Sequence, residues 1–111
     1  LYLIGRGVAQ DYQQARQWFE KAVAAGDPTA MDGLGYLYRE GLGVAQDYRQ
    51  ARQWYERAAA AGDAAAMDNL GFLYQYGYGV AQDYPHARQW YEKAAAAGDK
   101  DAPERLKALP Q

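Results

Sequence analysis

One pattern of 23 residues occurs three times in this chain of 111 residues, at a fixed spacing. The copy from Gly41 to Asp63 matches the copy from Gly77 to Asp99 at 19 of 23 positions, and it matches the copy from Gly5 to Asp27 at 18 of 23. The single tryptophans of the copies lie 36 residues apart, at Trp18, Trp54 and Trp90. A fixed period of this length predicts a stack of similar supersecondary units, each contacting only its neighbours.

The second half of each repeat has the pattern of an amphipathic helix. In the middle copy Asp47 is placed to cap the first turn, and Gln50 follows three residues later. Gly62 is suited to end the helix in a left-handed conformation. The apolar positions between them follow the 3.6-residue period of one helix face. They are Ala51, Trp54, Tyr55, Ala58 and Ala59.

The first half of each complete repeat predicts another helix. Asp27 is a candidate N-cap, and Pro28 occupies the first helical position, where its missing N–H is not needed. Gly35 and Gly71 interrupt the apolar faces of two such helices, at a cost of about 1 kcal/mol each relative to Ala. We therefore predict close helix–helix contact at both glycines, with the alanines of the following helix facing them (Ala51 and Ala87).

The three tryptophans recur in register with the core positions, so the sequence predicts that they are buried and structural. Ligand stacking by a ladder of indoles is the less favoured interpretation. The glycine pairs of the loops, such as Gly41 and Gly43, resemble part of a phosphate-binding loop. No strand precedes them, so nucleotide binding is not predicted.

The repeats divide the chain into four segments of one solenoid domain. Residues 1–27 are predicted to hold the end of a first helix followed by a second helix from about Tyr12 to Ala25. Residues 28–63 and 64–99 are full repeats, and residues 100–111 form a short capping helix. The chain begins inside a repeat, which suggests a fragment of a longer protein. We expect an apolar N-terminal end that promotes self-association at high concentration.

The composition argues against several classes of function. A net charge of −2 gives no basic surface for nucleic acid. The chain has no Cys and no Ser, which removes the usual nucleophiles, and its single histidine, His86, cannot build a His-rich metal site. No apolar run approaches the ~20 residues needed to span a bilayer. We therefore predict no enzyme activity, no cofactor, no metal and no membrane insertion, while the compartment, bacterial cytoplasm or periplasm, stays open.

A dozen positions in register identify a family resemblance. The middle copy carries Leu34, Gly35, Tyr38, Gly41, Gly43, Val44, Asp47, Ala51, Trp54, Tyr55, Ala58, Ala59 and Gly62. This pattern resembles the Sel1-like repeat, a relative of the tetratricopeptide repeat with a longer loop between its helices. The resemblance implies an all-α, right-handed superhelix of helical hairpins whose first helices line a concave face. It also implies a role in bacterial envelope, secretion, host-interaction or quality-control assemblies.

The exposed side of the first helices is the candidate site for a protein or peptide partner. It is predicted from helical spacing to carry nine residues: Asp32, Tyr36, Arg39, Glu40, Asp68, Asn69, Phe72, Gln75 and Tyr76. Aromatic side chains there would anchor an apolar or extended peptide, and polar ones would hold its backbone or a carboxylate. Tyr76 replaces Glu40 of the earlier copy and Tyr78 replaces Leu42, which makes these two the better candidates. The alternative is that Tyr36 and Phe72 only pack between repeats.

Three hypotheses for function follow from these observations. The favoured one is an adaptor or scaffold that binds a peptide or partner protein on the concave face. A second is a structural spacer within a larger protein. A third, suggested by relatives described as cell-wall or β-lactam hydrolases, is disfavoured because the chain lacks Ser and Cys.

Overall fold

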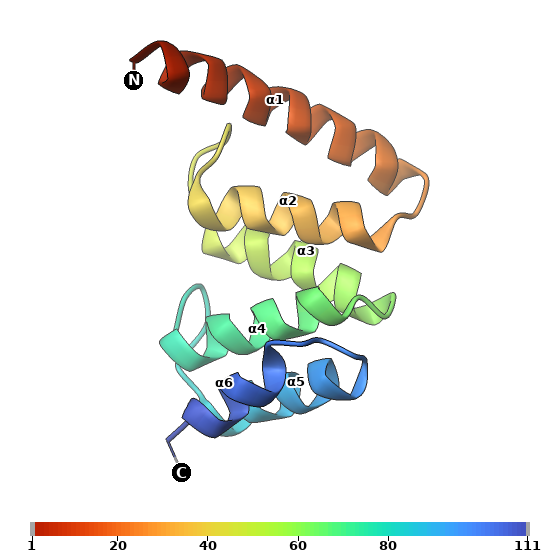
Figure 1. The fold of residues 1–111 in the computed structure, drawn as a ribbon, viewed down its shortest axis with the longest axis vertical. Coiled ribbons are helices and arrows are strands. Elements are labelled where there is room, and N and C mark those ends of the chain that lie inside the picture. Colours follow the sequence, from red (N-terminus) through yellow and green to blue (C-terminus); the bar gives the residue numbers. More distant parts are fainter. Residues whose placement is uncertain (1, 111) are drawn as a thin grey trace.

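The computed structural model describes the backbone of residues 2–110 and the side chains of residues 11–110. Within that part the chain forms α-helices and no strand. The helices stack one after another from the N-terminus to the C-terminus (Figure 1), in an array measuring 45 × 31 × 23 Å. They are α1 (Tyr2–Ala24), α2 (Pro28–Glu40), α3 (Tyr48–Ala60), α4 (Ala64–Tyr76), α5 (Tyr84–Ala96) and α6 (Ala102–Ala108). The predicted all-α solenoid of hairpins is confirmed, with α2–α3 and α4–α5 as the two complete hairpins.

Aspartates start several of the helices, as their positions predict. The Asp47 carboxylate accepts hydrogen bonds from the backbone N–H groups of Arg49 and Gln50, at 3.0 and 3.1 Å. Asp27 and Asp83 cap α2 and α5 in the same way. These bonds satisfy backbone donors that a helix leaves unpaired in its first turn. Asp63 lies at the equivalent position before α4, but its side chain accepts no capping hydrogen bond.

The loop inside each complete hairpin rests on the preceding repeat. Gly43 follows α2, and a Cβ added there would lie 2.9 Å from the Cβ of Tyr12 in α1. Gly79 follows α4, and its added Cβ would lie 2.8 Å from the Cβ of Tyr48 in α3. Real Cβ atoms do not approach so closely, so only glycine lets each loop reach the helix of the repeat before it.

The two helices of each hairpin meet at a glycine, but the facing residue differs from the prediction. A Cβ at Gly35 would lie 2.6 Å from a ring carbon of Tyr55, and one at Gly71 would lie 2.4 Å from a ring carbon of Tyr91. Both tyrosines are fully buried. The glycines therefore make room for a tyrosine ring. Ala51 was expected to face Gly35; it is buried nearby on the same helix stripe.

The first repeat differs from the later ones because α1 is a single unbroken helix from Tyr2 to Ala24. The sequence predicts a loop there, between the end of one helix and the start of another near Tyr12. In the later repeats that loop is held by the preceding helix, for example through the hydrogen bond from Asp47 N–H to the Tyr38 carbonyl. The first repeat contains only the last residues of such a helix, and a continued helix satisfies the backbone groups internally.

The predicted burial of the tryptophans is wrong for Trp18, which is 70% exposed. Trp54 and Trp90 are half-buried and pack against the core. Trp90 of α5 contacts the core cluster formed by residues between Met31 and Leu73, which belong mainly to the repeat before it.

Candidate interaction surface

Seven of the nine predicted site residues form one continuous surface across two helices. We call it the α2–α4 face. It consists of Asp32, Tyr36, Arg39 and Glu40 from α2 and Asn69, Phe72 and Tyr76 from α4. Residues three or four apart in a helix lie on the same side of it, so the site residues form one row on α2 and another on α4. The two rows meet where these helices are neighbours.

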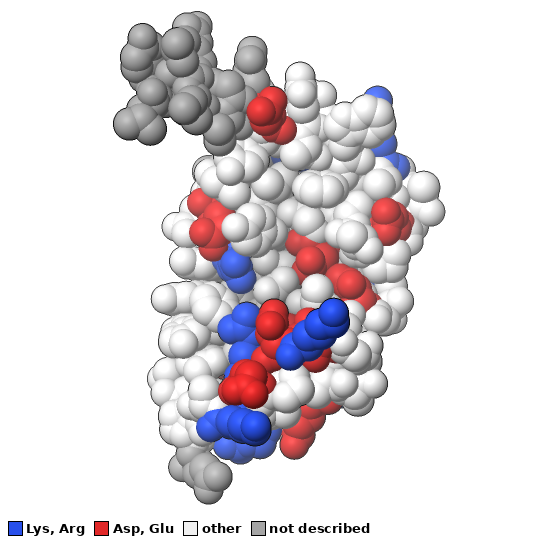
Figure 2. All heavy atoms as spheres, viewed as in Figure 1, with Lys and Arg blue, Asp and Glu red and all other residues white. Residues whose placement is uncertain are grey.

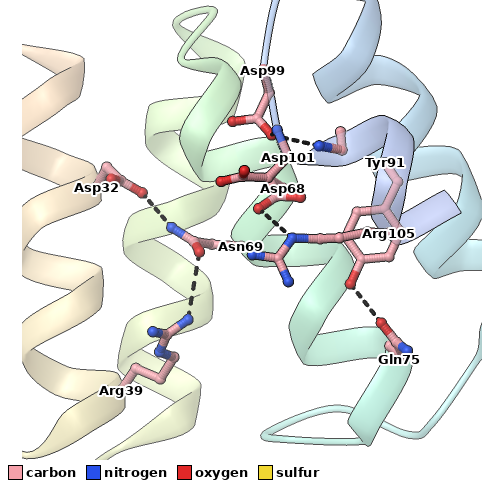
Figure 3. A network of polar contacts seen from close by, with 10 residues as sticks. Asp32, Arg39, Asp68, Asn69, Gln75, Tyr91, Asp99, Asp101 and Arg105 are labelled. Carbon is pink, nitrogen blue, oxygen red and sulfur yellow. Dashed lines mark hydrogen bonds and ion pairs between the residues drawn. The ribbon is translucent and has the colours of Figure 1, made fainter. Parts of the chain in front are cut away.

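A polar chain links the two helices at the centre of this face (Figure 3). The Asn69 side-chain amide donates a hydrogen bond of 2.9 Å to Asp32, and Arg39 donates one of 3.5 Å to the Asn69 oxygen. Burial raises the pKa of Asp32, the hydrogen bond from Asn69 lowers it, and the nearby carboxylate of Asp63 raises it. Asn69 is the only asparagine in the chain, so this link is particular to one pair of repeats.

Arg39 also lies between two aromatic rings of the face. Its guanidinium carbon is 5.0 Å from the ring centre of Tyr36 and 5.1 Å from that of Phe72. Its Nε donates to the Glu40 carboxylate at 3.0 Å. The cation–π contacts and the ion pair together fix the position of the Arg39 guanidinium. The Arg39–Glu40 pair has no net charge.

Aromatic side chains continue from Phe72 to the loop that follows α4. The ring centres of Phe72 and Tyr76 are 4.9 Å apart, and those of Tyr76 and Tyr78 are 5.8 Å apart. The ring of Tyr48 stacks on Tyr78 at 4.8 Å. We call Tyr36, Tyr48, Phe72, Tyr76 and Tyr78 the aromatic patch. Tyr36, Tyr76 and Tyr78 are 44, 51 and 37% exposed. The rings of Tyr76 and Tyr78 are neighbours, and Arg39 and Phe72 connect Tyr36 to them.

Sequence reasoning did not find Tyr48 as a member of this patch. A tyrosine occurs at the same position in every copy, as Tyr12 and Tyr84 also show. The presence of tyrosine at this position therefore does not distinguish Tyr48 as a member of the patch. Its contact with Tyr78 follows from the loop of one repeat resting on the helix of the repeat before, which the period alone does not reveal.

The two other predicted residues, Asp68 and Gln75, hold neighbouring helices instead of lining the face. Asp68 is 5% exposed and accepts a hydrogen bond of 2.9 Å from Arg105 Nε of α6 (Figure 3). Gln75 accepts one of 2.7 Å from the Tyr91 hydroxyl of α5. Burial raises the pKa of Asp68 to about 6, although the charge of Arg105 lowers it. Arg105 occupies the position equivalent to Asn69, so its bond to Asp68 is the counterpart of the bond between Asn69 and Asp32 one repeat earlier. It was not predicted.

Carboxylates gather beside the polar part of the face. We call Asp27, Asp32, Asp63 and Asp99 the acidic edge. Burial raises the pKa of Asp63, and the negative charges of Asp27 and Asp99 raise it further. Figure 2 shows acidic groups clustered near the middle of the view, next to α4 and α6, with a few basic side chains among them. The mutual repulsion of these carboxylates means that a cation would be favoured nearby.

Two further classes of site were examined over the same part of the chain. Residues 11–110 contain no group of three or more His, Cys, Asp or Glu side chains arranged to hold a metal ion. None of the described helices has both the length and the apolar character required to cross a bilayer.

Comparison with known proteins identifies the repeats. The sequence model of the Sel1 repeat matches residues 1–27, 28–63 and 64–99. A search of curated protein sequences gave no significant match.

Solved structures resemble the chain over most of its length. A Sel1 repeat protein from Oxalobacter formigenes is 38% identical with a TM-score of 0.81, over 95% of this chain and 43% of that one. The protective antigen c5321 of uropathogenic Escherichia coli, which displays an SLR fold, is 37% identical with a TM-score of 0.77, over 86% and 20%. Cysteine rich protein B of Helicobacter pylori is 31% identical with a TM-score of 0.78, over 85% and 71%. The chain thus spans less than half the length of the first two. With the repeat model matched three times in tandem, the chain belongs to the Sel1 repeat family.

Proposed function

We propose that this domain is a protein-interaction module that binds a peptide or a segment of a partner protein on the α2–α4 face. The observation that carries the proposal is the aromatic patch, where Tyr76 and Tyr78 are exposed next to each other and Tyr36 is exposed on the other side of Arg39. Grouped exposed rings are uncommon on surfaces without a partner, and tyrosine is enriched among residues that dominate binding energy.

A purely structural role explains only part of the patch. Phe72 and Tyr48 are half-buried and pack against the core, so their aromatic character is needed for stacking of the repeats. Tyr76 is 51% exposed in the last turn of α4, where the earlier repeat has Glu40. A glutamate at the equivalent position shows that the fold does not require an aromatic ring there.

The polar groups of the face suit a peptide backbone. Arg39 is held by Glu40 on one side and by Asn69 on the other, so a donor of fixed position lies between the rings of the patch. Fixed aromatic and guanidinium groups bind with little loss of side-chain entropy. This favours the adaptor role, because a structural spacer does not require an ordered and exposed aromatic patch.

An unbiased peptide-display selection against the domain tests the proposal. Selected peptides should bind Tyr76→Ala and Tyr36→Ala at least about tenfold more weakly than the wild type. Gln53→Ala, at an exposed position of α3, serves as the matched control, and circular dichroism verifies that each variant folds. Unchanged affinity in both tyrosine variants would support the spacer hypothesis instead.

We also propose that the exposed side of α1 makes contacts between chains at high concentration. A shallow hollow there is lined by Gln14, Gln17, Trp18 and Lys21, and Trp18 is the most exposed large hydrophobic side chain of the described residues. Sedimentation velocity at increasing concentration should show a larger species that Trp18→Gln removes. A single monomeric species at every concentration would refute this contact.

A further inference from the structure

The aromatic patch offers a partner ring faces and tyrosine hydroxyl groups. The hydroxyls of Tyr36, Tyr76 and Tyr78 form no hydrogen bond within residues 11–110, where other tyrosine hydroxyls do. The Arg39 guanidinium, beside them, carries only donors. Each of these hydroxyls can donate or accept a hydrogen bond, and the Glu40 carboxylate beside them already accepts from Arg39.

A surface made largely of aromatic rings favours a segment with few backbone N–H groups. Each peptide N–H pressed against an aromatic face would lose its water without gaining an acceptor, which costs free energy. Proline has no N–H, and its carbonyl remains available to accept from a tyrosine hydroxyl or from arginine. A proline-rich segment is also extended before binding, which lowers the entropy cost.

The length of the patch matches a short segment of this kind. Distances of 5.0, 5.1 and 5.7 Å lead from Tyr36 through Arg39 and Phe72 to Tyr78, and Tyr76 lies beside Phe72 and Tyr78 at 4.9 and 5.8 Å. Tyr36 and Tyr78 are therefore at most about 16 Å apart, and a polyproline II helix, which rises 3.1 Å per residue, would cover this span with about five residues or fewer.

The charged groups beside the aromatic patch indicate which residues would flank such a segment. Arg39 and Glu40 neutralise each other at 3.0 Å, so the patch itself favours uncharged residues. One helical turn before Tyr36 lies Asp32, part of the acidic edge, whose carboxylates repel one another. The Arg105 guanidinium is already paired with Asp68. The acidic edge therefore suits Lys or Arg side chains next to the proline-rich stretch.

We propose that the α2–α4 face binds an extended proline-rich peptide whose prolines pack on the aromatic patch and whose basic flank lies at the acidic edge. This inference rests on the proposed function and specifies its partner. It assigns separate tasks to two regions: the tyrosines recognise proline, and the aspartates recognise the basic flank.

Fluorescence polarisation with labelled synthetic peptides tests the inference. Two peptides carry six residues rich in proline, with three basic residues at either the N- or the C-terminal end, because the direction of binding is left to the experiment. In one comparison peptide alanines replace the prolines, and in another glutamates replace the basic residues. We expect one basic orientation to bind, and both comparison peptides to bind about tenfold or more weakly.

Variants of the domain separate the two regions. Tyr76→Ala should weaken binding by about tenfold at any ionic strength. Asp32→Asn, which keeps an acceptor for Asn69, should weaken binding by about threefold at low salt and reduce its salt dependence. Gln53→Ala should bind as the wild type does.

The outcomes are distinct. Equal binding of the alanine peptide, or undiminished binding by Tyr76→Ala, would overturn the inference. Absence of binding by both basic peptides up to about 1 mM would also overturn it. If display-selected peptides of another kind still depended on Tyr76 in that case, the proposed function would stand without this partner class.

Discussion

The Asn69 amide of α4 donates a hydrogen bond of 2.9 Å to the Asp32 carboxylate of α2, 37 residues earlier in the chain. The bond joins first helices of successive repeats on the surface proposed to bind a partner. The residue equivalent to Asn69 in the earlier repeat is Gly33, which has no side chain to make the same link. This connection therefore depends on one substitution between otherwise similar copies.

A double-mutant cycle between Asp32 and Asn69 measures that link. Asp32→Ala and Asn69→Ala should each alter stability, and the coupling between them should be about 0.5–1.5 kcal/mol, the usual net value of a partly buried hydrogen bond. Urea denaturation of the four proteins gives the coupling free energy. Additive effects of the two substitutions would show that the bond contributes nothing.

Replacing Gly71 by Ala should destabilise the protein, although Ala is the better helix former. The gain in helix propensity is about 1 kcal/mol, but the new Cβ would lie 2.4 Å from the buried ring of Tyr91. We expect a net loss of about 1–3 kcal/mol in the free energy of unfolding. In a Tyr91→Leu background, the same substitution should be neutral or stabilising. An equal loss in both backgrounds would mean that the ring is not the obstacle.

Asp68 should make stability depend on pH between about 4 and 6. Its pKa is raised by burial from 3.8 to about 6, so the folded protein holds this proton more tightly than the unfolded chain. The associated stability is fully present below pH 3.8 and is lost as pH rises through about 6. The stability of wild type relative to Asp68→Asn should therefore fall by about 2 kcal/mol across this range. Denaturation at several pH values measures the difference, with Glu56→Gln on the exposed side of α3 as control. A constant difference would contradict the assignment.

The equivalent tryptophans should respond differently to the same substitution. Trp18→Ala should change the free energy of unfolding by less than about 0.5 kcal/mol, because the side chain is 70% exposed. Trp54→Ala should cost about 2 kcal/mol, because its ring packs against the core under the guanidinium of Arg57. Chemical denaturation midpoints of the two variants provide the comparison. Similar losses would show that Trp18 is better packed than its exposure indicates.

The period and the helix signals were sufficient to predict the fold. Caps such as Asp47, the apolar stripe and the loop glycines recur every 36 residues, and each acts within one hairpin or between neighbours. The sequence did not predict which residue of one helix face makes a given contact. Ala51 and Tyr55 share a helix face, and spacing alone does not decide that the ring of Tyr55 fills the space at Gly35.

The sequence predicted only those features of the site that follow from the helical spacing shared by the repeats. Helical spacing placed Tyr36, Arg39 and Phe72 on one surface, and their rings and guanidinium do meet there. Asp68 was predicted on the same grounds, yet α6 covers it with Arg105, 37 residues later. The Asp68–Arg105 contact repeats the Asp32–Asn69 contact one unit later, but an arginine stands in place of the asparagine, so the period alone does not identify it.

The contact between a loop glycine and the tyrosine of the previous repeat occurs twice in the same form, at Gly43 with Tyr12 and at Gly79 with Tyr48. Each complete repeat carries both a loop glycine that contacts the repeat before it and a helix tyrosine at the position that the next loop contacts. In-frame duplication of one repeat would therefore create a new boundary with the same glycine–tyrosine contact. The number of repeats can thus change during evolution without further substitutions at the boundaries between them.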